Sequence, residues 1–212
     1  MLLERVNTAN SAIMQPVQKT SIPAGLRERK RAETHARIQA VAIRLFLERG
    51  FETTTLDDIA EAADVSRRSL FHYFESKEEI VLSARADFPT IIGEAIGRRP
   101  AGENLLDMVE NALIDTATRY GSTQTRALSR LIRDTPALSA GEQAKYEHVE
   151  RALAKALADR KSLPEIDTAC RVTAATAIGI LKLAVEAWLA GNDSGPEKNF
   201  RAAFDALRRI AG

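Results

Sequence analysis

The chain has 212 residues, of which 45% are hydrophobic and 28% are charged, which is typical of a soluble globular protein with one or two domains. Aromatic residues make up only 5%, and the abundance of Ala, Leu, Glu and Arg favours helices over strands. A formal net charge of +1 excludes a global basic excess as an argument for nucleic-acid binding. The single cysteine excludes an internal disulfide, and the longest apolar run, 172–190, is broken by two charged residues. We therefore expect a helical, cytoplasmic protein without a membrane span.

The N-terminal segment divides into an arm and a basic helix. Residues 1–24 lack sustained periodicity and contain two prolines, so we expect a flexible arm. Apolar residues then recur at helical spacing over 26–49, and Gly50 is well placed to end that helix. Seven basic residues against three acidic ones lie in 25–50. This local excess indicates contact with nucleic acid; a solvated helical face is the alternative.

Two short helices joined by a tight turn are predicted over 53–74. Thr55 is a suitable N-cap for the first helix, and Ser66 is one for the second, which we expect to continue to Phe74. The alanines between them would let the two helices cross closely. This is the geometry of a helix-turn-helix, whose second helix enters the major groove of DNA. A capping box at 76–79 is expected to open a fourth helix.

The first residues of the second short helix are candidates for base contacts, because such residues reach base edges in helix-turn-helix proteins. Arginine can donate two hydrogen bonds to O6 and N7 of guanine. The candidates are Ser66, Arg67, Arg68 and Ser69, followed on the same face by Phe71, His72 and Tyr73. Lys77, at the start of the next helix, is placed to bind a phosphate. The alternatives are solvated surface arginines and aromatic rings that only pack.

The run from about Arg27 to Ser83 resembles the N-terminal domain of the TetR family of bacterial repressors. The resemblance is carried by LFLERGF at 45–51, Thr53 to Thr55, Asp58 to Ala60, Ala63 to Ser66, Leu70 to Phe74, and Ser76-Lys77. It implies that Arg67, Arg68 and Phe71 face bases and that Thr54, Ser69, His72, Tyr73 and Lys77 hold phosphates. The chain departs from the family at Arg68, where a small residue or proline is frequent, and at Phe71, where tyrosine is common. Arg29, Lys30 and Arg31 are expected at phosphates or the minor groove, with flexible surface charge as the alternative.

Prolines and glycines over 89–102 are expected to interrupt the helical pattern, so we place the domain boundary there. The predicted organisation is the arm at 1–24, a TetR-type helix-turn-helix domain at 25–87, and a ligand-binding and dimerisation domain at 88–212. Further helices are predicted at about 104–120, 125–134, 140–160, 165–191 and 197–211, with a capping box at 139–142. The fold class is therefore all-α: a three-helix DNA-binding domain followed by a helical bundle.

The resemblance implies that the second domain forms a homodimer and holds a ligand pocket between its helices. The candidate interface residues are Ile178, Leu181, Val185, Leu189, Phe200, Phe204 and Leu207, and a monomeric core is the alternative. The candidate pocket residues are Phe88, Met108, Tyr120 and Trp188, with Arg130 and Arg133 as partners of an acidic ligand group. Core packing or internal ion pairs are the alternatives. The segment from Arg99 to Glu103 and the helices after it resemble sensors of acyl-CoA-like ligands, so the expected effector is acyl-CoA-like or another apolar molecule.

We expect a sequence-specific transcriptional regulator, a repressor that a small-molecule effector releases from double-stranded operator DNA. An activator is the alternative within this class, and a helical protein-interaction module that no longer reads DNA is the alternative outside it. The three histidines are scattered, and H-E-x-x-H, G-x-G-x-x-G and G-x-S-x-G motifs are absent. The sequence therefore nominates no catalytic, metal or cofactor residue, and we do not expect an enzyme.

Overall fold

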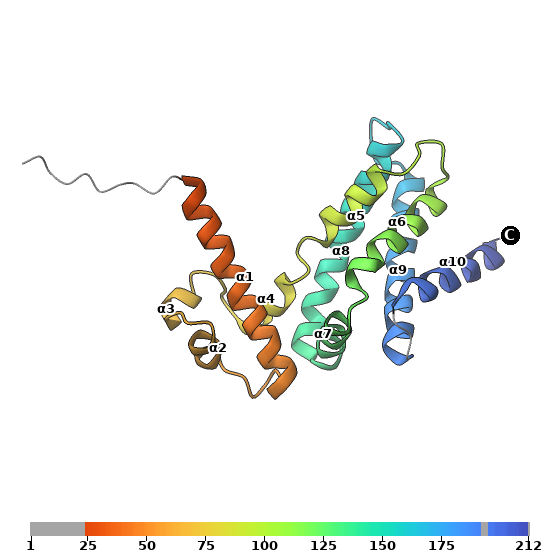
Figure 1. Ribbon diagram of the computed structural model, residues 1–212. Coiled ribbons are helices and arrows are strands. Elements are labelled where there is room, and N and C mark those ends of the chain that lie inside the picture. Colours follow the sequence, from red (N-terminus) through yellow and green to blue (C-terminus); the bar gives the residue numbers. More distant parts are fainter. Residues whose placement is uncertain (1–23, 192–194, 212) are drawn as a thin grey trace, which may run out of the picture. The chain divides into compact units, whose positions relative to one another are not determined.

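The computed structural model describes residues 24–191 and 195–211, and these form helices joined by short loops (Figure 1). Within these ranges no strand is present, which confirms the predicted all-α class. The chain divides into two compact units, one up to Thr34 and one from His35 onward. The predicted arm at 1–24 lies outside the described residues except for Ala24, where the first helix begins.

The first four helices are α1 (Ala24–Arg49), α2 (Leu56–Ala62), α3 (Arg67–Leu70) and α4 (Lys77–Ser83). Gly50 ends α1 as predicted: its φ of 95° lies in the left-handed region that favours glycine, and its N–H donates to the carbonyl of Phe46 at 3.0 Å. The chain can therefore turn sharply toward α2 without strain.

The predicted N-caps of α2 and α3 are confirmed. The Thr55 hydroxyl accepts from the Asp58 N–H at 3.1 Å, and the Asp58 carboxylate accepts from the Thr55 N–H at 2.8 Å. Ser66 caps α3 by accepting from the Ser69 N–H at 3.1 Å. Regular helix ends at Leu70, earlier than predicted. The next N–H groups, of His72 and Tyr73, donate to carbonyls three residues back instead of four, which makes a tighter turn.

Only half of the capping box predicted at 76–79 forms. The Ser76 hydroxyl accepts from the Glu79 N–H at 3.1 Å, as expected. The Glu79 carboxylate, however, accepts from the N–H of Glu75 rather than that of Ser76. The hydrogen bond at the start of α4 therefore includes Glu75, one residue before the predicted box.

The second half contains α5 (Phe88–Gly97), α6 (Leu105–Tyr120), α7 (Thr123–Asp134), α8 (Pro136–Arg160), α9 (Thr168–Ala190) and α10 (Glu197–Ala211). The expectation that 89–102 interrupts the helical pattern is wrong for most of that range, because α5 runs through it. Pro89 lies in the first turn of α5, where a missing N–H costs little. Gly93 faces Ala156 of α8, and an added Cβ would still be 3.9 Å from it.

The start predicted for α8 is also wrong. The helix begins at Pro136, and the N–H of Ser139 already donates to the carbonyl of Thr135 at 3.0 Å. Ser139 is therefore inside the helix and does not cap it. Proline at the first position favours this earlier start because its fixed φ matches the helix and its missing N–H would have no partner there.

Two apolar clusters hold these helices together. The first lies among the four helices α1, α2, α3 and α4. It contains Ile38, Ala42, Leu45, Phe46, Ile59, Ala60, Leu70, Phe74, Ile80 and Val81. It also includes Leu128 and Ile132 of α7 and Leu138 of α8. The N-terminal helices thus share a core with the second half of the chain. The second cluster is built by α5, α6, α8, α9 and α10.

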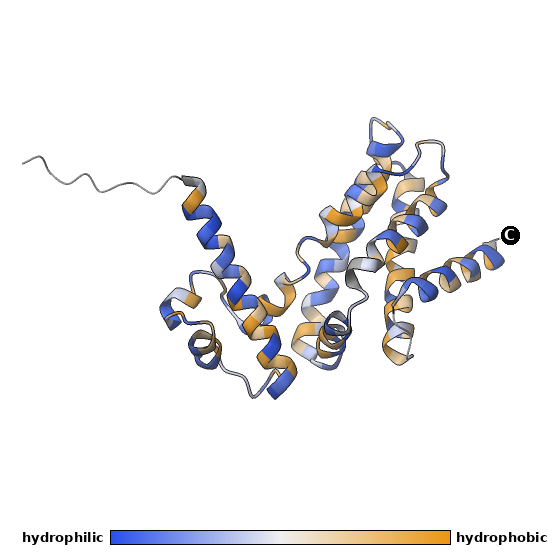
Figure 2. Cartoon of the chain, viewed as in Figure 1, coloured by the Kyte–Doolittle hydropathy of each residue, from blue (hydrophilic) through white to orange (hydrophobic). Residues whose placement is uncertain are grey.

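Helix α9 is the most apolar long helix of the chain, as its colouring shows (Figure 2). By length and composition it could cross a membrane, but 44% of its most apolar window is buried inside the protein. A core helix passes the same test. We therefore interpret the apolar character of α9 as core packing on one side and an exposed apolar stripe on the other.

Phe204 of α10 tests the second core, because it is fully buried while Phe71, the residue that follows α3, is 45% exposed. Replacing Phe204 with Ala should lower the free energy of unfolding by about 3–5 kcal/mol. The matched variant Phe71→Ala should lower it by less than about 1 kcal/mol. Urea denaturation at one fixed protein concentration measures both. Equal losses in the two variants would contradict the assignment of α10 to the core.

Candidate nucleic-acid interface and effector cavity

The turn between α2 and α3 sets their crossing. Asp64 adopts a φ of 50°, a left-handed conformation that aspartate tolerates better than most residues. The N–H of Val65 then donates back to the carbonyl of Ala60 at 3.0 Å. Ala60 and Ala63 are buried, so their small side chains allow close contact at the turn, as predicted. The pair forms a helix-turn-helix.

Helix α3 has one buried and one exposed side. Leu70 and Phe74 are buried in the first apolar cluster and fix α3 against α1. The side chains of Arg67, Arg68 and Phe71 are exposed on the other side. His72, in the turn that follows, is exposed as well. The arrangement presents two guanidinium groups and two rings to an external surface, which suits a groove lined by phosphates and base edges.

Arg67 is held in place by exposed contacts. Its Nη1 lies 2.8 Å from the Asp57 carboxylate, and its guanidinium lies 5.8 Å from the centre of the Phe71 ring. Arg68 has no hydrogen bond or ion pair to another described residue. An exposed ion pair contributes little free energy, so Arg67 can exchange Asp57 for a phosphate or a base at low cost.

Lys77 is tied to the protein itself. Its Nζ donates to the carbonyls of Phe51 at 2.9 Å and Thr54 at 3.1 Å and lies 4.6 Å from the centre of the Phe51 ring. These contacts connect the start of α4 to the loop between α1 and α2. Lys77 therefore helps to position the reading helices, and its predicted contact with a phosphate stays a prediction.

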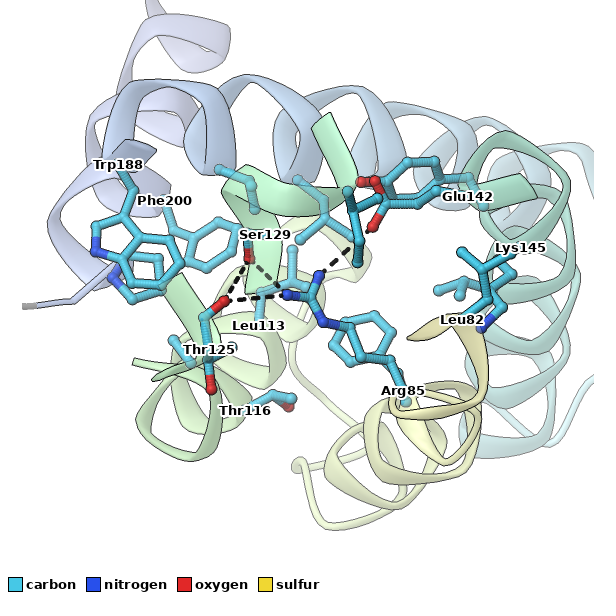
Figure 3. Close-up of a pocket in the computed structure, with 18 of the residues that line it drawn as sticks. Leu82, Arg85, Leu113, Thr116, Thr125, Ser129, Glu142, Lys145, Trp188 and Phe200 are labelled. Carbon is cyan, nitrogen blue, oxygen red and sulfur yellow. Dashed lines mark hydrogen bonds and ion pairs between the residues drawn. The ribbon is translucent and has the colours of Figure 1, made fainter. Parts of the chain in front are cut away.

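A cavity of about 100 Å³ lies between α4, α5, α6, α7, α8 and α9 (Figure 3). Its wall is mostly apolar and includes the rings of Phe88, Tyr146, Trp188 and Phe200. The polar side chains in the wall are few: Arg85, Thr116, Thr125, Ser129, Glu142 and Lys145. An apolar cavity with a few converging polar groups is the usual form of a small-molecule site.

Arg85 is the central polar residue of the cavity. Its Nη2 donates to the Ser129 hydroxyl and, at 3.3 Å, to the carbonyl of Thr125, while its Nη1 lies 3.5 Å from the Glu142 carboxylate (Figure 3). Burial raises the pKa of Glu142, and Arg85 and Lys145 oppose that shift. Burial lowers the pKa of Lys145, and the charge of Arg85 adds to that shift. Burial also raises the pKa of Tyr146 to about 12.

Comparison with known proteins shows the family. Residues 38–84 match the family described as "Bacterial regulatory proteins, tetR family", and residues 103–211 match "MftR C-terminal domain". The HTH-type transcriptional regulator TcmR of Streptomyces glaucescens is 31% identical over 196 residues, which cover 87% of each chain. The chain belongs to the TetR family. The regulator MftR of Mycobacterium tuberculosis is 32% identical over 184 residues, covering 84% of this chain and 91% of that protein.

A solved TetR-family regulator from Mesorhizobium loti has the same fold. It superimposes with a TM-score of 0.57 at 16% identity, over 84% of this chain and 96% of that one. The predicted resemblance is thus confirmed, and with it the architecture of a helix-turn-helix followed by a helical domain. As a TetR-family member the chain is a DNA-binding transcriptional regulator, and its relatives are regulators rather than enzymes.

Several residues predicted to contact DNA have side chains that are buried or hydrogen-bonded within the protein. Thr54 is only 1% exposed, and its hydroxyl donates to the carbonyl of Gly50 at 2.8 Å, so its side chain is not available to a phosphate. The hydroxyls of Ser66 and Ser69 are 2.8 Å apart and are used at the start of α3. Tyr73 is half-buried, with its ring centre 6.5 Å from that of His35. Ser66, Arg67, Arg68, Phe71 and His72 are exposed, as a contact with DNA requires, and their contact with DNA stays a prediction.

The basic residues before Thr34 belong to the first compact unit. Arg29, Lys30 and Arg31 are exposed along α1, and the Nε of Arg29 lies 3.7 Å from the Glu33 carboxylate. Their contact with phosphates or the minor groove stays a prediction.

Two of the residues predicted for the pocket line the cavity, namely Phe88 and Trp188. Met108 does not: it is fully buried in the second cluster. Arg130 donates to the carbonyl of Leu189 at 2.9 Å, and Arg133 pairs with Asp134 at 2.7 Å, so the alternative of internal contacts holds for both. The side chain of Tyr120 lies outside the described part of the structure.

The charged residues that line the cavity were not predicted from the sequence. Glu142 and Lys145 fall on the same helical stripe as Leu138 and Val149, both of which are buried. A charge at a position that should be apolar was the signal that could have identified them. For Arg85 no such signal exists, since its partners on α7 and α8 are 40 or more residues away.

The predicted dimer interface needs correction. Of the residues named for it, Ile178, Leu181, Leu189, Phe200 and Phe204 are buried within the single chain, and Leu181 and Phe200 line the cavity. Val185 and Leu207 are half-buried against the same core. These side chains have little or no surface to offer a partner, so the monomeric core given as the alternative accounts for most of them.

The role of Lys77 can be tested by its replacement with Met. The variant should lose about 2 kcal/mol of unfolding free energy, because two carbonyls lose a charged donor. It should keep the slope of log DNA affinity against log salt, whereas loss of a phosphate contact would reduce that slope by about one. Urea denaturation and fluorescence anisotropy supply the two measurements. Lys155→Met, at an exposed ion pair on α8, is the control. Unchanged stability with a reduced slope would make Lys77 a phosphate ligand.

Proposed function

We propose that this TetR-family protein is a cytoplasmic, dimeric repressor that leaves its operator when a small molecule occupies the cavity. The observation that carries the proposal is the two-sided character of α3. Leu70 and Phe74 hold it in the core, while Arg67, Arg68 and Phe71 remain exposed. A helix so short cannot hold its own conformation in water, so its orientation follows the core to which it is attached.

Effector release requires that the cavity influence the reading head. Arg85 follows α4 directly and makes its polar contacts with α7 and α8, on the cavity wall. Helix α4 in turn contributes Ile80 and Val81 to the core beneath the helix-turn-helix. A ligand that displaces or recruits the Arg85 guanidinium would therefore act on α4. The affinity for DNA can change only by the ratio of ligand affinities for the two states.

The dimer contact that we propose is the exposed stripe of α9, made by Val172, Ala175, Gly179, Leu183, Ala187 and Ala190. Val172 is 59% and Leu183 62% exposed in the single chain, and a Cβ added at Gly179 would meet no atom within 4 Å. An apolar stripe with small residues lets two helices approach closely and bury surface on both sides. Two subunits joined in this way would offer paired reading heads to the two half-sites of an operator.

The reading head is tested with the double variant Arg67→Ala/Arg68→Ala. Its affinity for the operator should fall at least about tenfold relative to a scrambled duplex, because bidentate arginine–guanine contacts contribute roughly 1–3 kcal/mol each. Fluorescence anisotropy over a salt series, with DNA from upstream of the protein's own gene, measures the loss. Arg151→Ala/Lys155→Ala on α8 removes the same charge away from α3.

If the α3 variant, still folded, keeps its preference for the operator, the assignment of α3 as the reading helix is wrong. If the unchanged protein binds no duplex selectively, including sequences selected from the genome, the chain is instead a helical interaction module.

The proposed dimer face is tested by Leu183→Glu. A carboxylate in the middle of the stripe would have to be buried without a partner, so the variant should elute as a monomer while the unchanged protein elutes as a dimer. Size-exclusion chromatography with light scattering measures the mass. Lys155→Glu provides an equally acidic change outside the stripe and should stay dimeric. Dimers of both variants would exclude this face.

A further inference from the structure

The cavity wall contains a large share of the chain's aromatic residues. Four of them, Phe88, Tyr146, Trp188 and Phe200, line it together with aliphatic side chains. Figure 3 shows Trp188 and Phe200 at the same end of the cavity. Aromatic walls favour flat ligands, because rings stack on rings in offset or edge-to-face arrangements. The body of the ligand is therefore expected to be aromatic.

The charges of the cavity do not balance. Among the described residues that line it, two are cations, Arg85 and Lys145, and one is a carboxylate, Glu142. The Glu142 carboxylate lies 3.5 Å from Nη1 of Arg85, whose Nη2 donates to the Ser129 hydroxyl and to the carbonyl of Thr125. Two of the guanidinium nitrogens, Nη1 and Nη2, therefore have partners within the protein, whereas the buried Nε has none among the described residues. One positive charge is left over, on Lys145.

The ammonium of Lys145 lacks a hydrogen-bond partner in the described structure, although its nitrogen is buried. A buried charge without a partner is costly, and proteins rarely keep one without a use. It lies close enough to Arg85 and Glu142 for their charges to act on it. The Lys145 ammonium is therefore placed to pair with a negatively charged oxygen of a bound ligand.

We propose that the cavity binds a compact aromatic carboxylic acid, whose carboxylate pairs with Lys145 while its ring packs against the aromatic wall. This ligand class deepens the proposed effector site and rests on that proposed function. The carboxylate would complete the charge balance of the site. The ring would make apolar contacts with the side chains that line the cavity.

The size of the cavity distinguishes this ligand from the acyl-CoA-like effector expected from the sequence. An apolar cavity of about 150 Å³ can bind benzene, so a volume of about 100 Å³ is on the scale of a single ring and not of a long acyl chain. An acyl-CoA carries several phosphate charges, and the lining offers only two cations, one of them paired with Glu142. A single carboxylate matches the single unpaired ammonium.

The test compares 3-phenylpropanoate with its neutral amide, 3-phenylpropanamide, by titration calorimetry on the full chain without DNA. The acid should bind at least about tenfold more tightly, because a charged hydrogen bond is gained. Quenching of Trp188, the chain's single tryptophan, should saturate in parallel and place the ligand in the cavity. Lys145→Met should bring the two affinities to within twofold, and Lys155→Met on the outer side of α8 should leave the preference unchanged.

Stability gives a second readout that does not depend on the ligand. Removing an unpaired buried charge should raise the melting temperature of the ligand-free Lys145→Met variant. Lys145→Gln replaces Met if that variant does not fold. Equal affinities of acid and amide in the unchanged protein, a preference that survives Lys145→Met, or the absence of binding by either compound would each overturn the proposal. Since no DNA is present, a failure to repress leaves these results unaffected, and acid binding without any effect on operator affinity would refute only the release mechanism.

Discussion

The guanidinium of Arg85 is the contact on which the connection between cavity and reading head depends. Arg85 lies just after the end of α4, and its guanidinium contacts Ser129 and Thr125 of α7 and Glu142 of α8. Apolar contacts run beside it: Leu128, Ile132 and Leu138 complete the core of the N-terminal helices. Gly141 of α8 leaves room for the end of the Leu82 side chain of α4, which a Cβ at that position would displace. Helix α4 is therefore held to the cavity wall by charge and by close packing at once.

This attachment matters because the reading helix has little stability of its own. α3 has a single turn of regular helix, a serine cap, and two buried anchors, Leu70 and Phe74. Its orientation is set by the core of α1, α2 and α4, and Lys77 adds a charged tie from α4 to the loop before α2. A small displacement of α4 would thus reach the loop and the core together. Short elements that depend on a shared core move with it as one body, which is how a change at a distant wall can alter DNA affinity.

Local chemistry made part of this structure predictable. The caps at Thr55 and Ser66 and the left-handed Gly50 depend on neighbours in sequence, and each was predicted correctly. Helix α5 was missed because burial of Ile92 and Ile96 outweighs the low helix propensity of its glycines. The dimer residues were misplaced for a different reason: an apolar pattern shows that a face is buried but not whether its own chain or a partner covers it. Phe204 and Leu183 are both apolar, yet only the fold shows that the first is enclosed and the second exposed.

Charges inside the cavity explain why an effector could change the balance between two states. Burial raises the pKa of Glu142 and lowers that of Lys145, so the charged form of each is less favourable than in water. Leucines at these positions would make a more stable bundle, since they would extend the apolar stripe of α8. The buried charges instead cost free energy, and a negatively charged ligand would remove part of that cost. The ligand can shift the balance between two states only if it removes more of the cost in one arrangement of Arg85 than in the other. A ligand carboxylate that pairs with Lys145 would reduce the attraction between the charges of Lys145 and Glu142. The ion pair between Glu142 and Arg85 would then become stronger or weaker according to where the ligand oxygen lies. The direction of the response would then follow from ligand geometry, and two acids of equal affinity could differ in whether they release DNA.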